Sequence, residues 1–299
     1  MNLITPAGFS FPVSRLALGC MSLGNDHSVN ERILHRAHEA GINFFDTADL
    51  YQSGQNEVTV GRALKGLRHQ VAIATKAGNR LRPDGSGWDW CADPAYIESA
   101  LEASLRRLGT DYVDLFQLHG GTLDDPIDEL IALFERLKAS GKIRAYGISS
   151  IRPNVIRRWM AAPQLSTVMM QYGPLDPRPE EDSLAYLEEK GAVLLARGVL
   201  AKGMMAGKPA APWLGWSEAE VARYLEAYRA IFPAPVLMAA AALEYVRAMA
   251  PRSISVVGVS NESQLQTLLQ AEEFCVNEKE MEGIFAIRPP FRYEEQFKI

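Results

Sequence analysis

Four ionisable side chains follow closely on apolar segments, at positions that packing alone does not explain. These residues are Asp46, Tyr51, Lys76 and His119. Each lies at or just past the C-terminal end of a segment that reads as a buried strand. A charge in such a setting costs free energy unless it is paired. We therefore predict that the four side chains meet at one site and that this site transfers protons.

The four residue types suit a general acid and the groups that adjust it. A tyrosine hydroxyl on its own is a weak acid that titrates near pH ~10. An ammonium beside a tyrosine stabilises the phenolate, and Lys76 can supply that charge. Asp46 is expected to keep the lysine protonated, and His119 to orient a carbonyl oxygen and help to relay the proton. Such a set protonates an alkoxide while hydride arrives from elsewhere, and a cofactor is required because no side chain donates hydride.

Eight strand-like segments alternate with helical patterns along the chain. They are Leu16–Gly19, Phe44–Ala48, Val71–Lys76, Val113–His119, Ile143–Ser149, Thr167–Gln171, Val193–Arg197 and Ser253–Gly258. Their interiors are mostly apolar, as expected for parallel strands buried on both faces. The alternation predicts an α/β fold, a (β/α)8 TIM barrel, in a single domain over residues 1–299. Catalytic residues of such barrels come from strand ends at one face, so the fold accounts for a shared site.

Helix boundary signals support this division of the chain. Ser28 is expected to cap a helix over Asn30–Ala40. Asp93, which is followed by proline, is expected to cap a helix that ends at Leu108, just before a glycine. Asp125, also followed by proline, is expected to begin a third helix. Each predicted helix therefore begins after the preceding strand and ends before the next one.

The connections after the third and seventh strands are long. Residues 77–93 and 198–252 are rich in glycine, proline and tryptophan, and long barrel loops usually serve binding. The first residues, Leu3–Pro12 with Gly8 near their centre, are expected to form a hairpin that plugs the bottom of the barrel. We expect the two long loops and the C-terminal tail to determine which substrate is bound.

Composition and charge narrow the range of partners. The chain has 299 residues, a net charge of −5 and no basic stripe, which counts against nucleic acid or an anionic membrane. Cys20, Cys91 and Cys275 lack the spacing of metal ligands and fit free thiols in a reducing cytoplasm. The N-terminus lacks a signal-peptide pattern, and the most apolar stretch, Pro235–Val246, is too short to span a membrane. We expect a cytoplasmic protein without a metal site, and the sequence leaves its oligomeric state open.

A set of short motifs occurs in a fixed order along the predicted elements. They read Leu18-Gly19-Cys20-Met21, Asp46-Thr47-Ala48-Asp49-Leu50-Tyr51, Ala74-Thr75-Lys76, Val113-Asp114-Leu115-Phe116-Gln117-Leu118-His119, Tyr146-Gly147-Ile148-Ser149-Ser150 and Met170-Gln171-Tyr172. Each motif is weak alone, but on the whole set the chain resembles the aldo-keto reductases over nearly its full length. The resemblance implies a (β/α)8 barrel that uses NADPH to reduce aldehydes or ketones. It also implies that Tyr51 is the general acid, that Lys76 and Asp46 tune it, and that His119 orients the substrate carbonyl.

The resemblance further implies which residues hold the cofactor. They are Cys20, Met21, Ser149, Ser150, Gln171, Arg197, Gly198, Leu200, Lys202, Gly258, Ser260 and Gln264. Ser149 and Gln171 match residues that hold the nicotinamide carboxamide in the family. Ser150 stands where many members have asparagine, and Arg197 stands where many have an aromatic residue stacked on the nicotinamide. A guanidinium plane can stack as well, although it adds positive charge near the ring.

Two further segments match the phosphate-binding parts of the family. Residues 198–203 match a loop whose backbone holds the pyrophosphate, and residues 258–261 lead into a helix beginning near Glu262. A helix N-terminus can bind phosphate through its free N–H groups. No arginine follows Gly258, where many members bind the adenosine 2′-phosphate. NADPH is therefore the expected cofactor and NADH the less favoured one, with a smaller preference than in members that carry the arginine.

Two other functions fit part of this pattern. The family includes ion-channel β subunits that keep the fold and the nucleotide site with slow turnover, so a cofactor-binding sensor or regulatory subunit is the main alternative. A barrel enzyme without nicotinamide, such as a lyase or an isomerase, is a third reading. It would have to explain Ser149 and Gln171 without a carboxamide to hold. The partner expected for the leading reading is a small-molecule carbonyl substrate, whose identity the sequence does not reveal.

Overall fold

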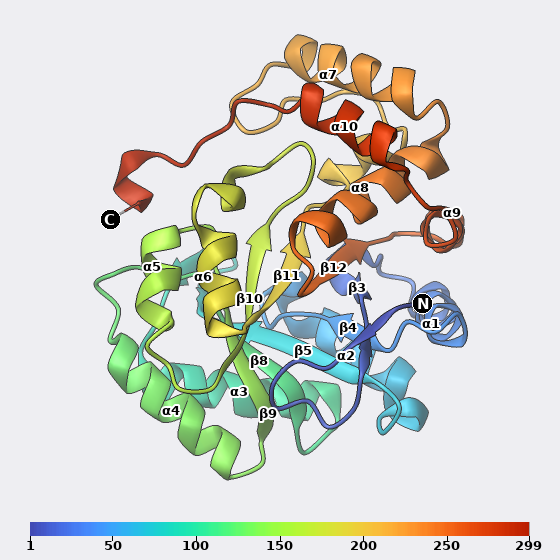
Figure 1. The fold of residues 1–299 in the computed structure, drawn as a ribbon. Helices are drawn as coiled ribbons and strands as arrows, with labels where there is room; N and C mark the ends of the chain where they lie inside the picture. Colours follow the sequence, from blue (N-terminus) through green and yellow to red (C-terminus); the bar gives the residue numbers. More distant parts are fainter. Residues whose placement is uncertain (299) are drawn as a thin grey trace.

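Eight parallel strands close into a barrel at the centre of the structure, a computed structural model that describes residues 1–298 (Figure 1). In order around the barrel the strands are β3 (Leu16–Gly19), β4 (Phe44–Asp46), β5 (Ala72–Ala77), β8 (Val113–His119), β9 (Ile143–Ser149), β10 (Leu165–Gln171), β11 (Val193–Arg197) and β12 (Ser253–Gly258). β12 pairs with β3 and closes the sheet. The predicted barrel is confirmed, although β4 ends at Asp46 rather than at Ala48.

Both faces of the barrel strands are apolar, which explains the continuous apolar runs in the sequence. Successive residues of a strand point to opposite faces. On β8, for example, Leu115 packs inside the barrel, whereas the next residue, Phe116, packs outward with Phe134 at a ring-centroid distance of 5.4 Å. Alanines on β5 leave room inside the barrel for larger side chains from other strands.

Helices surround the barrel (Figure 1). Their bounds are α1 (His27–Glu39), α2 (Gln55–Leu64), α3 (Pro94–Leu108), α4 (Ile127–Ala139), α5 (Pro153–Trp159), α6 (Ser183–Lys190), α7 (Glu218–Ile231), α8 (Pro235–Met249), α9 (Glu262–Ala271) and α10 (Glu278–Ala286). Short 3-10 helices lie in the connections at η1 (Cys20–Ser22), η2 (Tyr51–Gly54), η3 (Lys65–Leu67), η4 (Arg178–Glu181), η5 (Ala201–Ala206) and η6 (Glu295–Phe297).

The helix caps agree with the predictions in part. Asp93 caps α3 as predicted, since its side chain accepts a hydrogen bond from the Tyr96 N–H. The predicted cap at Ser28 is wrong. Asp26 caps α1 instead and accepts the N–H groups of Ser28 and Val29, so that Ser28 lies inside the first turn. A carboxylate two residues earlier offers the stronger acceptor and takes the cap position.

A prediction about the third helix also needs correction. α4 begins at Ile127 after Pro126, and no side chain caps it. The Asp125 carboxylate accepts hydrogen bonds from the Thr122 N–H, at 2.6 Å, and from Trp90 Nε1, at 2.8 Å. Asp125 therefore ties the loop after β8 to the loop after β5 instead of capping the helix.

The N-terminal hairpin closes the bottom of the barrel as predicted. β1 (Leu3–Ile4) pairs with β2 (Val13–Ser14), and Phe9 at the turn packs among the inward-facing residues at the start of the strands. Phe9 meets Phe44 edge to face at 5.7 Å between ring centroids. Gly8 has a φ of +87°, and a Cβ there would lie 2.8 Å from the Arg144 carbonyl oxygen. Only glycine fits this close approach without strain.

Each of the two long connections contains structure of its own. The first forms a hairpin of β6 (Asn79–Leu81) and β7 (Trp88–Trp90), which the sequence did not predict. The second contains η5 and α7 before α8, and α7 lies beside α10 at the top of Figure 1. Both connections begin directly after a barrel strand, β5 or β11, and therefore start at the end of the barrel where the strands end.

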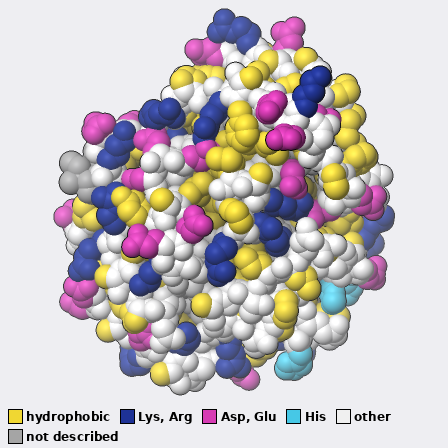
Figure 2. Space-filling model, in the orientation of Figure 1, with side chains coloured by type: hydrophobic (Ala, Val, Ile, Leu, Met, Phe, Trp, Pro, Cys, Tyr) yellow, Lys and Arg dark blue, Asp and Glu magenta, His cyan; other side chains and the backbone are white. Residues whose placement is uncertain are grey.

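The surface charges, the helix lengths and the metal-ligand side chains concern three partners that the sequence counts against: nucleic acid, a membrane and a metal ion. Acidic and basic side chains are interspersed over the face drawn in Figure 2. Within residues 1–298 no single helix is long and apolar enough to cross a membrane, and the pair α7 and α8, which passes together, bends by 97°. In the same residues no three His, Cys, Asp or Glu side chains gather as metal ligands.

Candidate active site

A buried ion pair joins the ends of β4 and β5. Lys76 is fully buried, and its Nζ donates hydrogen bonds to Asp46 Oδ2 at 2.8 Å and to the Thr47 carbonyl oxygen at 2.7 Å. The hydroxyl of Tyr51 lies 3.4 Å from the same nitrogen. Asp46, Tyr51 and Lys76 lie together because β4 and β5 are neighbours in the barrel.

The turn that carries Tyr51 has an unusual backbone. Tyr51 begins η2, and the next two residues, Gln52 and Ser53, have φ values of 50° and 53°. A left-handed conformation costs roughly 1–3 kcal/mol at a residue other than glycine. Gln52 offsets part of this cost because its Nε2 donates a hydrogen bond to the Leu23 carbonyl oxygen at 2.7 Å. The turn thereby keeps the tyrosine beside Lys76.

His119 ends β8 and completes the predicted group. Its ring stands at 85° to the Tyr51 ring, with 6.0 Å between centroids. Nδ1 is buried and has no hydrogen-bond partner among residues 1–298. Burial, together with the charges of Lys76 and Arg197, lowers the pKa of His119 to about 3. The imidazole is therefore neutral at physiological pH.

The neutral state of His119 has a measurable effect on stability. An unfolded histidine titrates near pH ~6.5, so between that pH and the lowered pKa of about 3 the unfolded state binds more protons. The contribution is complete above pH ~6.5 and is lost as the pH falls. We expect the unfolding free energy of the wild type to drop by about 2 kcal/mol more than that of His119→Gln between pH 7.5 and 5. Urea unfolding at both pH values measures this, and equal drops would contradict it.

In the Lys76–Asp46 pair, each charge favours the ionised form of the other group. Burial acts to lower the pKa of Lys76, but Asp46 and the Tyr51 hydroxyl outweigh it, and the pKa lies above its ordinary value. Burial raises the pKa of the Asp46 carboxyl, and the charge of Lys76 opposes that rise. Two short hydrogen bonds from Nζ favour the ammonium form. Lys76 therefore carries its positive charge next to the phenolic oxygen.

The ends of β9, β10 and β11 bring together the residues predicted to face the nicotinamide. Ser149 and Ser150 are buried at the end of β9. Gln171 and Arg197 are paired in register at the ends of β10 and β11, and Arg197 Nη1 donates a hydrogen bond to Gln171 Oε1 at 3.1 Å. Burial lowers the pKa of Arg197, and the Tyr51 hydroxyl and Asp176 act against that shift.

The segment after β11 forms a tight turn with an unusual run of backbone angles. Gly198, Ala201, Lys202 and Gly203 have φ values of 73°, 43°, 57° and 95°. The Leu200 carbonyl oxygen accepts the Gly203 N–H at 2.7 Å. Turns that combine left- and right-handed residues can gather N–H groups into a concave anion site. The segment thus has the backbone character expected of a pyrophosphate loop.

The segment after β12 leads into α9 as predicted. Asn261 caps this helix, since its Oδ1 accepts the Gln264 N–H at 2.9 Å. Gln264 Oε1 in turn accepts hydrogen bonds from the N–H and the hydroxyl of Ser260, at 2.9 and 3.1 Å. Ser260 and Asn261 are exposed beside Gly258. The predicted phosphate-binding residues therefore form one exposed unit at the N-terminus of α9.

The two predicted cofactor residues after β3 differ in accessibility. Cys20 is fully buried, and its Sγ lies 3.7 Å from the Leu18 carbonyl oxygen. Burial raises the pKa of its thiol, so it is not a reactive cysteine. Met21 is 64% exposed and is the one of the two residues that a ligand can reach directly.

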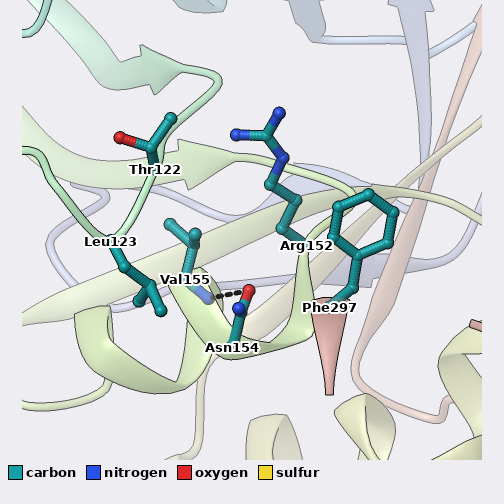
Figure 3. A pocket seen from close by; sticks show the side chains of 6 residues that line it. All are labelled: Thr122, Leu123, Arg152, Asn154, Val155 and Phe297. Carbon is teal, nitrogen blue, oxygen red and sulfur yellow. Dashed lines mark hydrogen bonds between the residues drawn. The ribbon is translucent and has the colours of Figure 1, made fainter. Parts of the chain in front are cut away.

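A cavity of about 400 Å³ lies between the loop after β8, the start of α5 and the C-terminal tail (Figure 3). Its lining residues are Thr122, Leu123, Arg152, Asn154, Val155 and Phe297. Arg152 Nη1 donates a hydrogen bond to the Gly121 carbonyl oxygen at 2.7 Å, and its side chain extends between Thr122 and the ring of Phe297. The cavity thus adjoins the loop that follows His119 but is lined by other residues than the proton-transfer group.

Sequence reasoning missed two residues that the structure brings to this site, Asp176 and Arg178. Asp176 accepts a hydrogen bond from Gln171 and two from Arg178. The segment Pro174–Pro179 offers a weak signal, since an acidic and a basic residue stand two apart among three prolines. Nothing in the sequence reveals that the aspartate reaches Gln171.

The structure is thus a closed (β/α)8 barrel in which a tyrosine, a lysine–aspartate pair and a histidine gather at the strand ends. The sequence profile of the aldo/keto reductase family matches residues 15–288. The chain belongs to this family, whose members carry out nicotinamide-dependent carbonyl reduction.

Relatives and a solved structure agree with this assignment. An uncharacterised oxidoreductase, YqkF, of Bacillus subtilis is 43% identical over 87% of each chain. The holo form of aldo-keto reductase AKR11C1 from Bacillus halodurans is 41% identical, covers 99% of both chains and superposes with a TM-score of 0.90.

Two further relatives are named for different cofactors. The Schizosaccharomyces pombe aldo-keto reductase yakc [NADP(+)] is 31% identical over 67% of this chain and 62% of its own length. The NADH-specific methylglyoxal reductase of Escherichia coli is 33% identical over 65% of this chain and 66% of its own length. Related chains thus differ in the cofactor for which they are named.

Proposed function

We propose that this protein, acting as one domain, reduces an aldehyde or ketone to an alcohol with Tyr51 as the general acid and NADPH as the cofactor. The observation that carries the proposal is the contact of the buried Lys76 Nζ with Asp46 Oδ2, at 2.8 Å, and with the Tyr51 hydroxyl, at 3.4 Å. Reduced nicotinamide supplies a hydride when bound. The protein must then deliver a proton to the carbonyl oxygen.

The proton-transfer residues divide this task. Tyr51 donates its hydroxyl proton, and Lys76 stabilises the phenolate that remains. Asp46 keeps Lys76 protonated and fixed in position. His119, which is neutral because its pKa is lowered, orients the substrate oxygen through a ring nitrogen. With a pKa of about 3, His119 is a poor proton carrier at neutral pH and takes no part in the relay that we propose.

The cofactor residues fit a nicotinamide dinucleotide. Gln171 and Ser149 are suited to hold the carboxamide, with Ser150 beside them, and Arg197 to lie against the ring. The turn that contains Gly198, Leu200 and Lys202 is suited to the pyrophosphate, and the unit of Gly258, Ser260 and Gln264 to the adenosine phosphate. The support is geometric, since left-handed turns and a helix N-terminus both present N–H groups to anions.

A kinetic assay with a panel of carbonyl compounds tests the reaction. We expect NADPH oxidation that depends on added aldehyde or ketone and saturates with its concentration. Tight NADPH binding with turnover on none of the panel would instead favour the cofactor-binding sensor or regulatory subunit.

We expect NADPH to bind tenfold to a hundredfold more tightly than NADH, or roughly 1.4–2.8 kcal/mol. The 2′-phosphate needs donors or cations, and arginine recognises it best. No arginine follows Gly258, so the exposed N-terminus of α9 and Ser260 must recognise the 2′-phosphate. Each of them contributes only modestly to its binding free energy. The E. coli relative is named as NADH-specific, and NADH lacks the 2′-phosphate.

Fluorescence titration with both cofactors measures the preference. Gln264→Glu places a negative charge beside the proposed phosphate site and should reduce the preference. Gln270→Glu, an exposed change near the other end of α9, is the matched control and should leave it unchanged. Equal or tighter binding of NADH by the parent protein would show that this unit does not recognise the phosphate.

A further inference from the structure

The side-chain amide of Gln171 is held at both ends. Its Nε2 donates a hydrogen bond to Asp176 Oδ2 at 2.8 Å, and its Oε1 accepts one from Arg197 Nη1 at 3.1 Å. Asp176 is buried, with 2% of its surface exposed. Arg178 holds the same carboxylate with two hydrogen bonds, from Nε at 2.7 Å and from Nη2 at 2.9 Å.

These contacts permit one orientation of the Gln171 amide. An ionised carboxylate only accepts hydrogen bonds, and a guanidinium only donates them. A flipped amide would set its oxygen against Asp176 and its NH₂ group against Arg197, and both contacts would be repulsive. Asp176 therefore holds the NH₂ group on its own side and leaves the amide oxygen, with its second lone pair, on the side of Arg197.

The loop after β10 fixes Asp176 itself. Gly173 and Asp176 exchange backbone hydrogen bonds at 2.9 and 3.3 Å, which closes a tight turn. The Arg178 guanidinium lies 5.2 Å from the centre of the Tyr293 ring, which is buried in the C-terminal tail. The turn thus fixes the backbone of Asp176. Its carboxylate is held by Arg178, which a cation–π contact with Tyr293 keeps in place.

We propose that Asp176 is a positioning residue that fixes the Gln171 amide for the nicotinamide carboxamide. The inference rests on the proposed function, in which Gln171 holds that carboxamide. With Asp176 in place, the oxygen of Gln171 is already oriented to accept the carboxamide NH₂, so that binding does not have to reorient the side chain. We expect the effect to fall on the nicotinamide half of the cofactor, because the Asp176 side chain bonds to Gln171 and Arg178, whereas the residues proposed for the adenosine phosphate follow β12.

The test compares two ligands on Asp176→Asn, which keeps the shape of the side chain and removes its charge. The ligands are NADPH and adenosine 2′,5′-bisphosphate, which lacks the nicotinamide half. We expect the variant to bind NADPH about tenfold more weakly, since a hydrogen bond to a charged group typically contributes at least that factor. The affinity for adenosine 2′,5′-bisphosphate should stay within about twofold of the parent, a split that general structural damage would not produce. Equal weakening of both ligands, or unchanged NADPH binding, would overturn the proposal.

Two variants complete the design. Asp182→Asn is the matched control, because Asp182 lies on the same loop and pairs with Arg157 at 3.3 Å outside this network. It should bind both ligands as the parent does. Gln171→Ala separates the positioning role of Asp176 from the proposed contact of Gln171 with the carboxamide. If it weakens NADPH binding and Asp176→Asn does not, only the positioning role is wrong; if Gln171→Ala leaves NADPH binding unchanged, the assignment of Gln171 to the carboxamide is wrong as well.

Discussion

Replacing Tyr51 by phenylalanine is expected to lower turnover by ~10²–10⁴, the range that general acid catalysis typically supplies. The change removes the transferable proton and keeps the ring, which stands at 85° to His119. The cofactor residues lie on other strands, so NADPH binding should remain close to that of the parent. Single-turnover kinetics with saturating NADPH, together with a binding titration, measure the two effects separately.

A matched control for this change is Tyr186→Phe. The Tyr186 hydroxyl accepts a hydrogen bond from Arg157 on α5, away from the strand ends, and has no contact with the proton-transfer residues among those that the structure describes. Its removal should leave turnover unchanged. Near-normal turnover of Tyr51→Phe would show that another group donates the proton.

Replacing Lys76 by methionine is expected to reduce turnover strongly and to destabilise the protein. Methionine roughly keeps the length of the side chain and removes the charge that stabilises the phenolate. It also leaves Asp46 buried without its partner, and breaking a buried ion pair typically costs ~3–5 kcal/mol. Because the Asp46 carboxyl can take up a proton instead, part of that cost should disappear at low pH. Urea unfolding at several pH values and carbonyl reduction at neutral pH measure the two effects.

Lys142→Met is the control for Lys76→Met. Lys142 pairs with Glu102 at a position where both side chains are more than one-third exposed, and such surface pairs contribute ~0–1 kcal/mol. This variant should keep its activity and nearly all of its stability. If Lys76→Met reduced carbonyls as fast as the parent, the charge of Lys76 would have no part in the reaction.

The elements that were predictable from the sequence are those with a purely local signal. The strand Val113–His119 is an apolar run with a definite end, and the structure has it at the same residues. The α3 cap at Asp93 follows from an aspartate before a proline. At α1 the same kind of signal gave a wrong prediction. Two residues near the start of this helix, Asp26 and Ser28, can cap it, and Ser28, which is nearer to the apolar pattern, is not the cap.

The contacts that were not predictable join residues distant in the chain or within irregular loops. Asp176 and Gln171 are close in sequence, but their hydrogen bond depends on the turn at Gly173 and on Arg178, which the Tyr293 ring covers. The side chain of Trp90 is another example. It crosses to Asp125 and lies so close to Gly78 and Gly120 that a Cβ at either would be within 3 Å of it. Composition gives no information about such partners.

The pairing of β3 with β12 has a consequence for the order of events during synthesis. Arg15 and Ser253, which hydrogen-bond across this seam, are 238 residues apart. At typical translation rates the first barrel strand waits on the order of 10–50 s before its last neighbour is made. Until then β3 has an unpaired edge, and long-range pairing of this kind slows folding. The nascent chain therefore keeps an edge open to aggregation for most of its synthesis, and a chain that stalls before residue 253 cannot close its barrel.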